Sequence, residues 1–131
     1  MDTTDYDQNL DWSNKKILIV EDDVFSAEYL LEVLSETNVQ TILSNNGLEA
    51  VEQTKNNPDL DLILMDIQLP GISGEKATIL IREFNPGIPI IAQTAHAMSN
   101  DKESYLNAGC TDYLSKPILM TDLFLTLKKY L

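Results

Sequence analysis

Side chains that could bind a metal ion and a phosphoryl group follow four short apolar runs of this sequence. Residues 21–23 are Glu-Asp-Asp and come directly after the first run, and Asp66 ends another. Thr94 and Lys116 stand after two later runs. Carboxylates with room for water are ligands that Mg²⁺ prefers, and an aspartate carboxylate can act as a nucleophile toward phosphorus. These are the residue types that reversible phosphorylation of an aspartate needs.

The charges in such a group set its chemistry. Neighbouring carboxylates repel one another and raise each other's pKa unless a cation lies between them. A divalent metal offsets the repulsion between an aspartate and an incoming phosphoryl group. Lys116 and the hydroxyl of Thr94 could then hold the other phosphoryl oxygens. Each part alone is a weak signal, because a Glu-Asp-Asp turn is usually a solvated loop, but the four together form a strong one.

The apolar runs alternate with amphipathic segments, which predicts how these residues are positioned. The expected strands are 16–20, 41–43, 62–65, 88–92 and 112–114. The expected helices are 25–36, 47–54, 74–84, a segment from the N-cap Ser99 to Asn107, and 120–131. Five βα units with apolar strands predict an α/β fold, a parallel sheet with helices on both faces. Sites in such sheets lie beyond the carboxyl ends of the strands, so the residues named above should share one pocket.

Composition limits the class of protein. The chain has 131 residues, enough for one domain, and a net charge of −12, which disfavours direct binding to nucleic acid. Cys110 is the only cysteine, so no intramolecular disulfide can form, and this favours a reducing cytoplasm. Cys110 itself is expected to be buried. No apolar run is long enough to cross a membrane. Residues 1–14 are acidic and predict a flexible leader before a folded domain at 15–131, with Trp12 able to pack on the domain edge.

Four segments resemble the receiver domains of response regulators in two-component signalling. They are I-L-I-V-E-D-D at 17–23, L-M-D-I-Q-L-P-G-I-S-G at 64–74, P-I-I-A-Q-T-A-H-A-M at 89–98 and D-Y-L-S-K-P at 112–117. The resemblance covers about residues 15–131. It implies a flavodoxin-like sandwich like that of the chemotaxis regulators, with strand order 2-1-3-4-5. It also implies a phosphorelay protein that accepts a phosphoryl group from a histidine kinase or a histidine phosphotransfer protein, and that is not an enzyme in the usual sense.

The resemblance also assigns the metal site. It implies that Asp66 is both the phosphoacceptor and a metal ligand, and that Asp22 binds Mg²⁺ directly, while Glu21 acts mainly through water. The backbone carbonyl of Gln68 is expected to complete the protein's share of the metal ligands. Mn²⁺ is expected to substitute for Mg²⁺. The family more often has Asp than Glu at position 21, a variation that lengthens the side chain by one methylene.

A second set of residues is expected to respond to the phosphoryl group. The resemblance implies that Lys116 pairs with the group, that Thr94 is the switch hydroxyl and that Tyr113 is the switch aromatic. The peptide bond before Pro117 is often cis in the family. The surface expected to change consists of the helix that ends at Asn107, the strand 112–114 and the last helix.

Three other positions vary within the family. Gln68 and His96 stand where side chains tune the lifetime of the phosphoryl group by controlling access of water. As a lone histidine, His96 could be mistaken for a phosphoryl carrier, but a polar residue at the rim of the pocket is the better interpretation. Ser73 stands where many relatives have Asp, and it should still cap the helix that follows.

The sequence leaves several alternatives open. We expect a stand-alone regulator, a monomer or weak homodimer that signals to an unidentified downstream protein, without an attached output module. A receiver segment of a larger hybrid histidine kinase is the alternative, because the motifs also resemble receivers of that kind. An aspartyl-phosphate phosphatase would carry its nucleophile after the first strand, and a flavodoxin would repel its flavin phosphate from residues 21–23. A degenerate receiver would usually lack Asp66 or Lys116. The cognate kinase and the phosphoryl lifetime are not specified by the sequence.

Overall fold

Five strands and five helices alternate along the chain. The computed structural model describes residues 10–95 and 101–131. The strands are β1 (Lys16–Val20), β2 (Gln40–Ser44), β3 (Leu62–Asp66), β4 (Ile90–Thr94) and β5 (Asp112–Ser115). The helices are α1 (Val24–Ser35), α2 (Gly47–Asn56), α3 (Gly74–Arg82), α4 (Asp101–Ala108) and α5 (Met120–Tyr130). The βα repeat predicted from the sequence is therefore confirmed.

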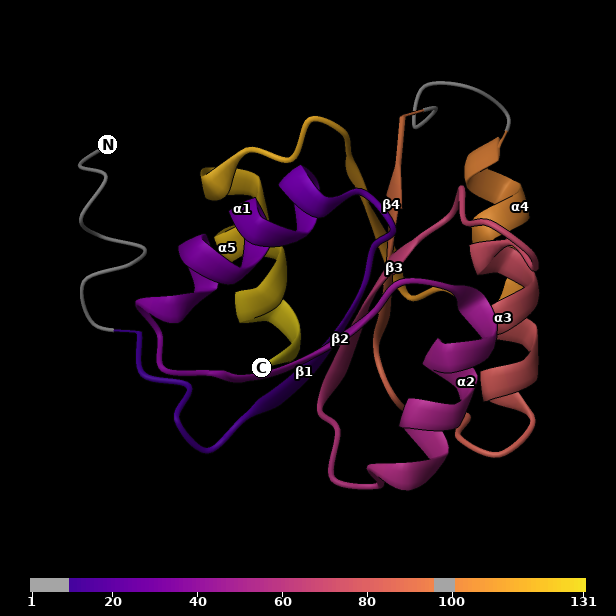
Figure 1. Cartoon of the computed structure of the whole chain (residues 1–131), viewed down its shortest axis with the longest axis horizontal. Helices are drawn as coiled ribbons and strands as arrows, with labels where there is room; N and C mark the ends of the chain where they lie inside the picture. Colours follow the sequence, from indigo (N-terminus) through magenta and orange to yellow (C-terminus); the bar gives the residue numbers. More distant parts are fainter. Residues whose placement is uncertain (1–9, 96–100) are drawn as a thin grey trace.

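The strands form one parallel sheet in the order β2-β1-β3-β4-β5 (Figure 1). β1 pairs with both β2 and β3, so that Ile17 lies opposite Thr41 on one side and Leu62 on the other. β3 and β4 are buried along their whole lengths, as apolar strands covered on both faces should be. The predicted fold class and strand order are both confirmed.

Two apolar layers separate the sheet from its helices. In Figure 1, α1 and α5 cover one face of the sheet, and α2, α3 and α4 cover the other. Successive residues of β1 divide between the layers. Ile17 and Ile19 pack with α1 and α5, whereas Leu18 and Val20 pack on the opposite face. This alternation follows from the period of two of a strand, and it fixes which side chains at the strand ends point toward which helices.

Two residues of the described segment before β1, Leu10 and Trp12, pack against the domain. Trp12 is 7% exposed and belongs to the core layer beneath α1 and α5. Its ring lies 6.1 Å from that of Phe124, and its backbone N–H donates to the carbonyl of Thr37. Leu10 packs against the same layer. Burial of this large aromatic side chain at the edge of the domain agrees with the packing that the sequence allowed for Trp12.

The region around β4 differs from the sequence prediction in the bounds of the strand. β4 begins at Ile90 and ends at Thr94, two residues later than the predicted strand 88–92. Pro89 has no N–H to donate, and the pairing of β4 with β3 begins at Ile90, which lies opposite Ile63. The backbone N–H of Ile90 donates to the hydroxyl of Thr111. The predicted N-cap Ser99 lies outside the described residues. No helix among those described is long and apolar enough to span a bilayer.

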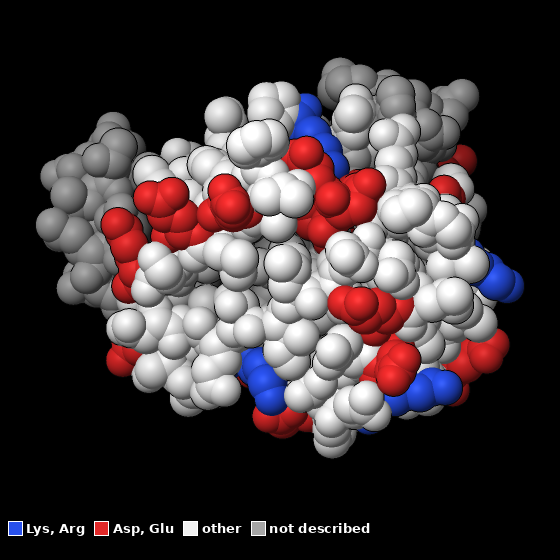
Figure 2. Space-filling model, viewed as in Figure 1, with Lys and Arg blue, Asp and Glu red and all other residues white. Residues whose placement is uncertain are grey.

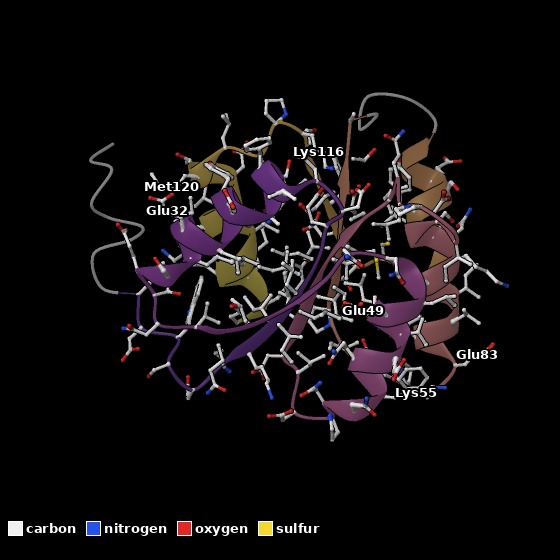
Figure 3. The ribbon with its side chains drawn as sticks, in the orientation of Figure 1. Glu32, Glu49, Lys55, Glu83, Lys116 and Met120 are labelled. Atoms are coloured by element: carbon white, nitrogen blue, oxygen red, sulfur yellow. The ribbon has the colours of Figure 1, made fainter. Side chains whose placement is uncertain are left out.

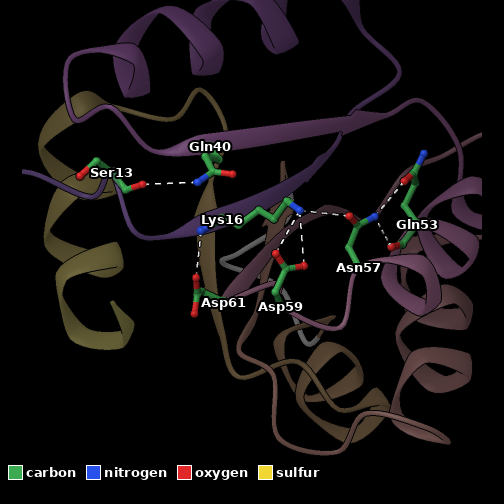
Figure 4. Close-up of polar contacts among 7 residues, drawn as sticks. All are labelled: Ser13, Lys16, Gln40, Gln53, Asn57, Asp59 and Asp61. Atoms are coloured by element: carbon green, nitrogen blue, oxygen red, sulfur yellow. Dashed lines mark hydrogen bonds and ion pairs between the residues drawn. The ribbon is translucent and has the colours of Figure 1, made fainter.

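Polar contacts fix the amino end of β1, at the edge opposite the candidate site (Figure 4). The Lys16 ammonium donates to Asn57 Oδ1 at 3.1 Å and to Asp59 Oδ2 at 3.2 Å, and its backbone N–H donates to Asp61 at 2.9 Å. Gln40 donates to the carbonyl of Ser13. These bonds tie the loop before β3 to β1.

Candidate functional site

The carboxyl ends of the strands bring three of the predicted acidic residues together. Glu21 follows β1 and is 2% exposed, Asp22 is exposed, and Asp66 ends β3 and is 2% exposed. One carboxylate oxygen from each residue lies within 4.8 Å of the others. In Figure 2, acidic side chains gather toward the upper edge of this face beside a basic one. Oxygen donors at this spacing form a ligand set suited to a hard divalent cation.

Lys116 balances this cluster. Its ammonium lies 3.3 Å from Glu21 Oε2 and 3.2 Å from Asp66 Oδ1, and it extends from the loop after β5 (Figure 3). The cation is partly exposed whereas both carboxylates are buried. Lys116 therefore contacts the two carboxylates from the open side of the pocket, where an incoming anion would meet it. The Lys116–Pro117 peptide bond is cis.

The electrostatics follow from burial. Burial, together with the charge of Asp66, raises the pKa of Glu21 to about 7. Burial also raises the pKa of Asp66, although Lys116 opposes the shift. Burial alone would lower the pKa of Lys116, but the two carboxylates outweigh it and raise the pKa. The pocket therefore holds more negative charge than one ammonium neutralises, and a cation that enters it would be stabilised.

The third acidic residue after β1 has a different role. Asp23 is the N-cap of α1, and its carboxylate accepts hydrogen bonds from the backbone N–H of Ser26 at 2.9 Å and from its hydroxyl at 2.7 Å. These bonds lower the pKa of Asp23. The Glu-Asp-Asp sequence thus divides between the pocket and a helix cap. Residue type alone does not show which of Asp22 and Asp23 faces the pocket. The start of α1 at Val24 decides it, because it makes Asp23 the N-cap.

The loop after Asp66 is held close to the end of β3. The backbone N–H of Gln68 donates to Asp66 Oδ1 at 3.1 Å, which orients the carboxylate. A Cβ on Gly74 would collide with the carbonyl oxygen of Asp66, so only glycine allows α3 to begin this close to the strand. Ser73 accepts from the backbone N–H of Lys76 and caps α3, as predicted from the sequence. Gln68 itself is exposed beside the pocket.

The hydroxyl of Thr94 has a partner that the sequence analysis did not identify. Thr94 ends β4 and is 1% exposed, and its Oγ1 lies 2.7 Å from the hydroxyl of Tyr105 on α4. Tyr113 is half-buried on β5 and packs against the same core layer as Tyr105. The sequence could have revealed Tyr105 only as the largest apolar side chain of a short, polar helix. His96 lies outside the described residues.

A cavity of about 680 Å³ adjoins the pocket on the side of α1. It is lined by Glu21, Phe25, Ser26, Tyr29, Leu30, Gln93, Lys116, Pro117 and Ile118. Gln93 is fully buried, and neither its amide nitrogen nor its amide oxygen has a hydrogen-bond partner among the described residues. Phe25 is 80% exposed at the rim. This cavity therefore connects the acidic pocket of Glu21 and Lys116 to solvent, and most of its other lining side chains are apolar.

The fold and the pocket together define a phosphoacceptor domain of the response-regulator type. A sequence profile of the response regulator receiver domain matches residues 17–128. This chain belongs to that family. It is accordingly a phosphoacceptor rather than a conventional enzyme.

Curated relatives carry this domain in two settings. Hybrid signal transduction histidine kinase G of Dictyostelium discoideum is 43% identical over 120 residues, which are 88% of this chain but only 4% of that protein. The polar-differentiation response regulator DivK of Brucella anthropi is 39% identical over 119 residues, 89% of this chain and 96% of DivK. The chain thus spans a small part of one relative and nearly all of the other.

Solved structures show the same architecture. The receiver domain of the sensor histidine kinase PA1611 from Pseudomonas aeruginosa has a TM-score of 0.82 and is 35% identical, over 88% of this chain and 96% of that one. It holds a magnesium ion in its active-site cleft. A Saccharomyces cerevisiae structure joins the phosphotransfer protein Ypd1 to the receiver domain of Ssk1 and matches with a TM-score of 0.81 and 34% identity, over 88% of each chain.

Proposed function

We propose that this chain accepts a phosphoryl group on Asp66 and that Asp66, Asp22 and the backbone carbonyl of Gln68 hold the Mg²⁺ that the transfer needs, with Glu21 acting mainly through water. The observation that carries the proposal is the buried Asp66 carboxylate, within 4.8 Å of two further carboxylates and 3.2 Å from the Lys116 ammonium. When bound, the metal supplies positive charge against the incoming phosphoryl oxygens. Mn²⁺ offers the same charge and is expected to replace it.

The chain's own residues then have distinct tasks. A carboxylate oxygen of Asp66 attacks phosphorus, the bond between phosphorus and the donor's imidazole nitrogen breaks, and the imidazole keeps that electron pair. Lys116 exchanges part of its contact with Asp66 for a phosphoryl oxygen, and Thr94 offers its hydroxyl to another. Gln68 comes two residues after Asp66 in the sequence and His96 two residues after Thr94, and we assign to both the control of water access to the phosphoryl group. Tyr113 is the switch aromatic, which changes its position when Thr94 turns inward.

The donor in this proposal is a histidine kinase or a histidine phosphotransfer protein. Receivers pair with such proteins, as the Ssk1 receiver does with Ypd1. The signal leaves through the surface of α4, β5 and α5, where Leu106 and Leu125 are exposed. A downstream protein, or a second copy in a weak homodimer, would cover this surface. A cytoplasmic location suits the donor class and the unpaired Cys110.

Intact-mass spectrometry with a small phosphodonor and Mg²⁺ tests the proposal. We expect the wild-type chain to gain the mass of one phosphoryl group, and the gain to be lost in Asp66→Asn and on chelation of the metal. Asp59→Asn is the matched control, because Asp59 is an exposed aspartate that pairs with Lys16 at the opposite edge of the sheet. Labelling of Asp66→Asn at the wild-type rate would disprove the assignment.

A further inference from the structure

Tyr105 connects α4 directly to the predicted switch hydroxyl. Its side chain is 3% exposed, whereas the neighbouring α4 residues Glu103, Ser104, Leu106 and Asn107 are exposed. Its hydroxyl lies 2.7 Å from Thr94 Oγ1, and both groups are buried. Among the α4 side chains that the structure describes, Tyr105 is therefore the one that anchors the helix to the sheet.

The geometry sets up a competition for Thr94. Either hydroxyl can donate in the contact between Thr94 and Tyr105, and in both cases this buried bond fixes the position of Thr94 Oγ1 beside the Tyr105 hydroxyl. A phosphoryl group on Asp66 would bring strongly accepting oxygens to the same end of the sheet, since Asp66 lies opposite Gln93, next to Thr94. For Thr94 to turn toward them, its contact with Tyr105 must weaken or break.

We propose that Tyr105 is a positioning residue that holds Thr94 in the orientation of the unphosphorylated domain and that releases it when Asp66 is phosphorylated. The inference rests on the proposed function. It assigns α4 a direct contact with the switch, additional to the expected route through Tyr113 on β5. Tyr105 and Tyr113 pack in the same core layer, so the release of one hydroxyl bond affects both elements of the output surface.

Tyr105→Phe is the direct test, because it removes the hydroxyl and keeps the ring. The measurement is the affinity for beryllofluoride in the presence of Mg²⁺, since beryllofluoride mimics a phosphoryl group on an aspartate. Loss of the hydroxyl removes a bond that favours the unphosphorylated orientation. We expect beryllofluoride to bind roughly two- to tenfold more tightly, the range for one hydrogen bond. The affinity for Mg²⁺ alone should not change.

Tyr130→Phe is the matched control. The Tyr130 hydroxyl donates to Asp112 Oδ2 at 2.9 Å from the last helix, away from the pocket, so this variant also loses one tyrosine hydrogen bond. We expect it to bind beryllofluoride as the wild type does. A change in affinity that is common to both variants would mean that Tyr105 acts only through stability, and it would overturn the proposal.

A double-mutant cycle with Thr94→Val shows whether Tyr105 acts through Thr94. We expect the effect of Tyr105→Phe to disappear in the Thr94→Val background. Unchanged or weaker binding by Tyr105→Phe, or an effect that persists without the threonine hydroxyl, would overturn the inference while the proposed function stands. If the wild type binds no beryllofluoride, both fail. Should Tyr105→Phe not fold, NMR of the wild-type Tyr105 ring on addition of beryllofluoride gives the answer, and unchanged resonances would refute release.

Discussion

Neighbouring acidic residues acquire different properties from their surroundings in this domain. Glu21 is buried beside Asp66 and Lys116, and its pKa rises to about 7. Asp23, two residues later, caps α1, and its pKa falls. Burial and mutual repulsion therefore disfavour the ionised form of the pocket carboxylates when no metal is bound. The ionised form of Asp23 is instead stabilised by its hydrogen bonds to Ser26. This contrast makes pH a probe of the metal site.

The affinity for Mg²⁺ should fall as the pH decreases through about 7. The metal-free pocket keeps a proton on Glu21 below its raised pKa, whereas the metal needs the carboxylate ionised. Protons therefore compete with Mg²⁺ below pH 7, and the affinity levels off above it. Isothermal titration calorimetry of Mg²⁺ binding at pH values below and above the Glu21 pKa of about 7 measures the effect.

The control for this prediction is Glu21→Gln, which cannot titrate. We expect its affinity for Mg²⁺ to be lower than that of the wild type at high pH and to depend less on pH. An equally steep dependence in this variant would show that another group binds the proton.

The elements place the site through the ends of the strands. Glu21, Asp66 and Lys116 lie at the ends of β1, β3 and β5 or directly after them. The start of α3 fixes the loop that follows Asp66. The contact between Gly74 and the Asp66 carbonyl is the closest constraint of this kind, because a side chain there would push the acceptor strand and the helix apart. The position of α3 and the geometry of Asp66 are thus coupled.

Gly74→Ala should lower both stability and phosphorylation. The added methyl group forces α3 away from β3, at a cost of about 1–3 kcal/mol for overpacking. Gly87→Ala is the matched control, because nothing lies within 4 Å of its Cβ position. Chemical denaturation measures stability, and the rate of labelling by a small phosphodonor measures function. Equal behaviour of the two variants would argue against the coupling.

The sequence predicted these elements well where the apolar signal was continuous, as in β1 and β3. It shifted β4 by two residues because Pro89 removes a donor and the fully buried Gln93 looks like a loop residue. It placed Glu21, Asp66 and Lys116 together, since strand ends must converge. It did not identify Tyr105, because the orientation of a short polar helix depends on tertiary packing.

At the scale of the whole molecule, opposite edges of the sheet carry different charge balance. Lys16 is surrounded by polar partners at the amino edge, whereas two buried carboxylates share Lys116 at the carboxyl edge. A cation that binds only the folded pocket should therefore stabilise the entire domain.

Mg²⁺ at a hundred times its dissociation constant should add about 2.7 kcal/mol to the free energy of unfolding. Thermal unfolding with Mg²⁺ or with a chelator measures this gain. Combined Glu21→Gln and Asp22→Asn should abolish most of it, because both changes remove ligands from the predicted site. Asp59→Asn should keep it. A gain of the same size in the double variant would place the metal elsewhere.

The central claim is that Asp66 carries the phosphoryl group, and one measurement locates it directly. Borohydride reduces an aspartyl phosphate to homoserine, so the labelled and reduced chain can be digested and sequenced by mass spectrometry. We predict homoserine at position 66, only after treatment with phosphodonor and Mg²⁺. Homoserine at a different aspartate, or a phosphorylated chain with intact Asp66, would contradict the account.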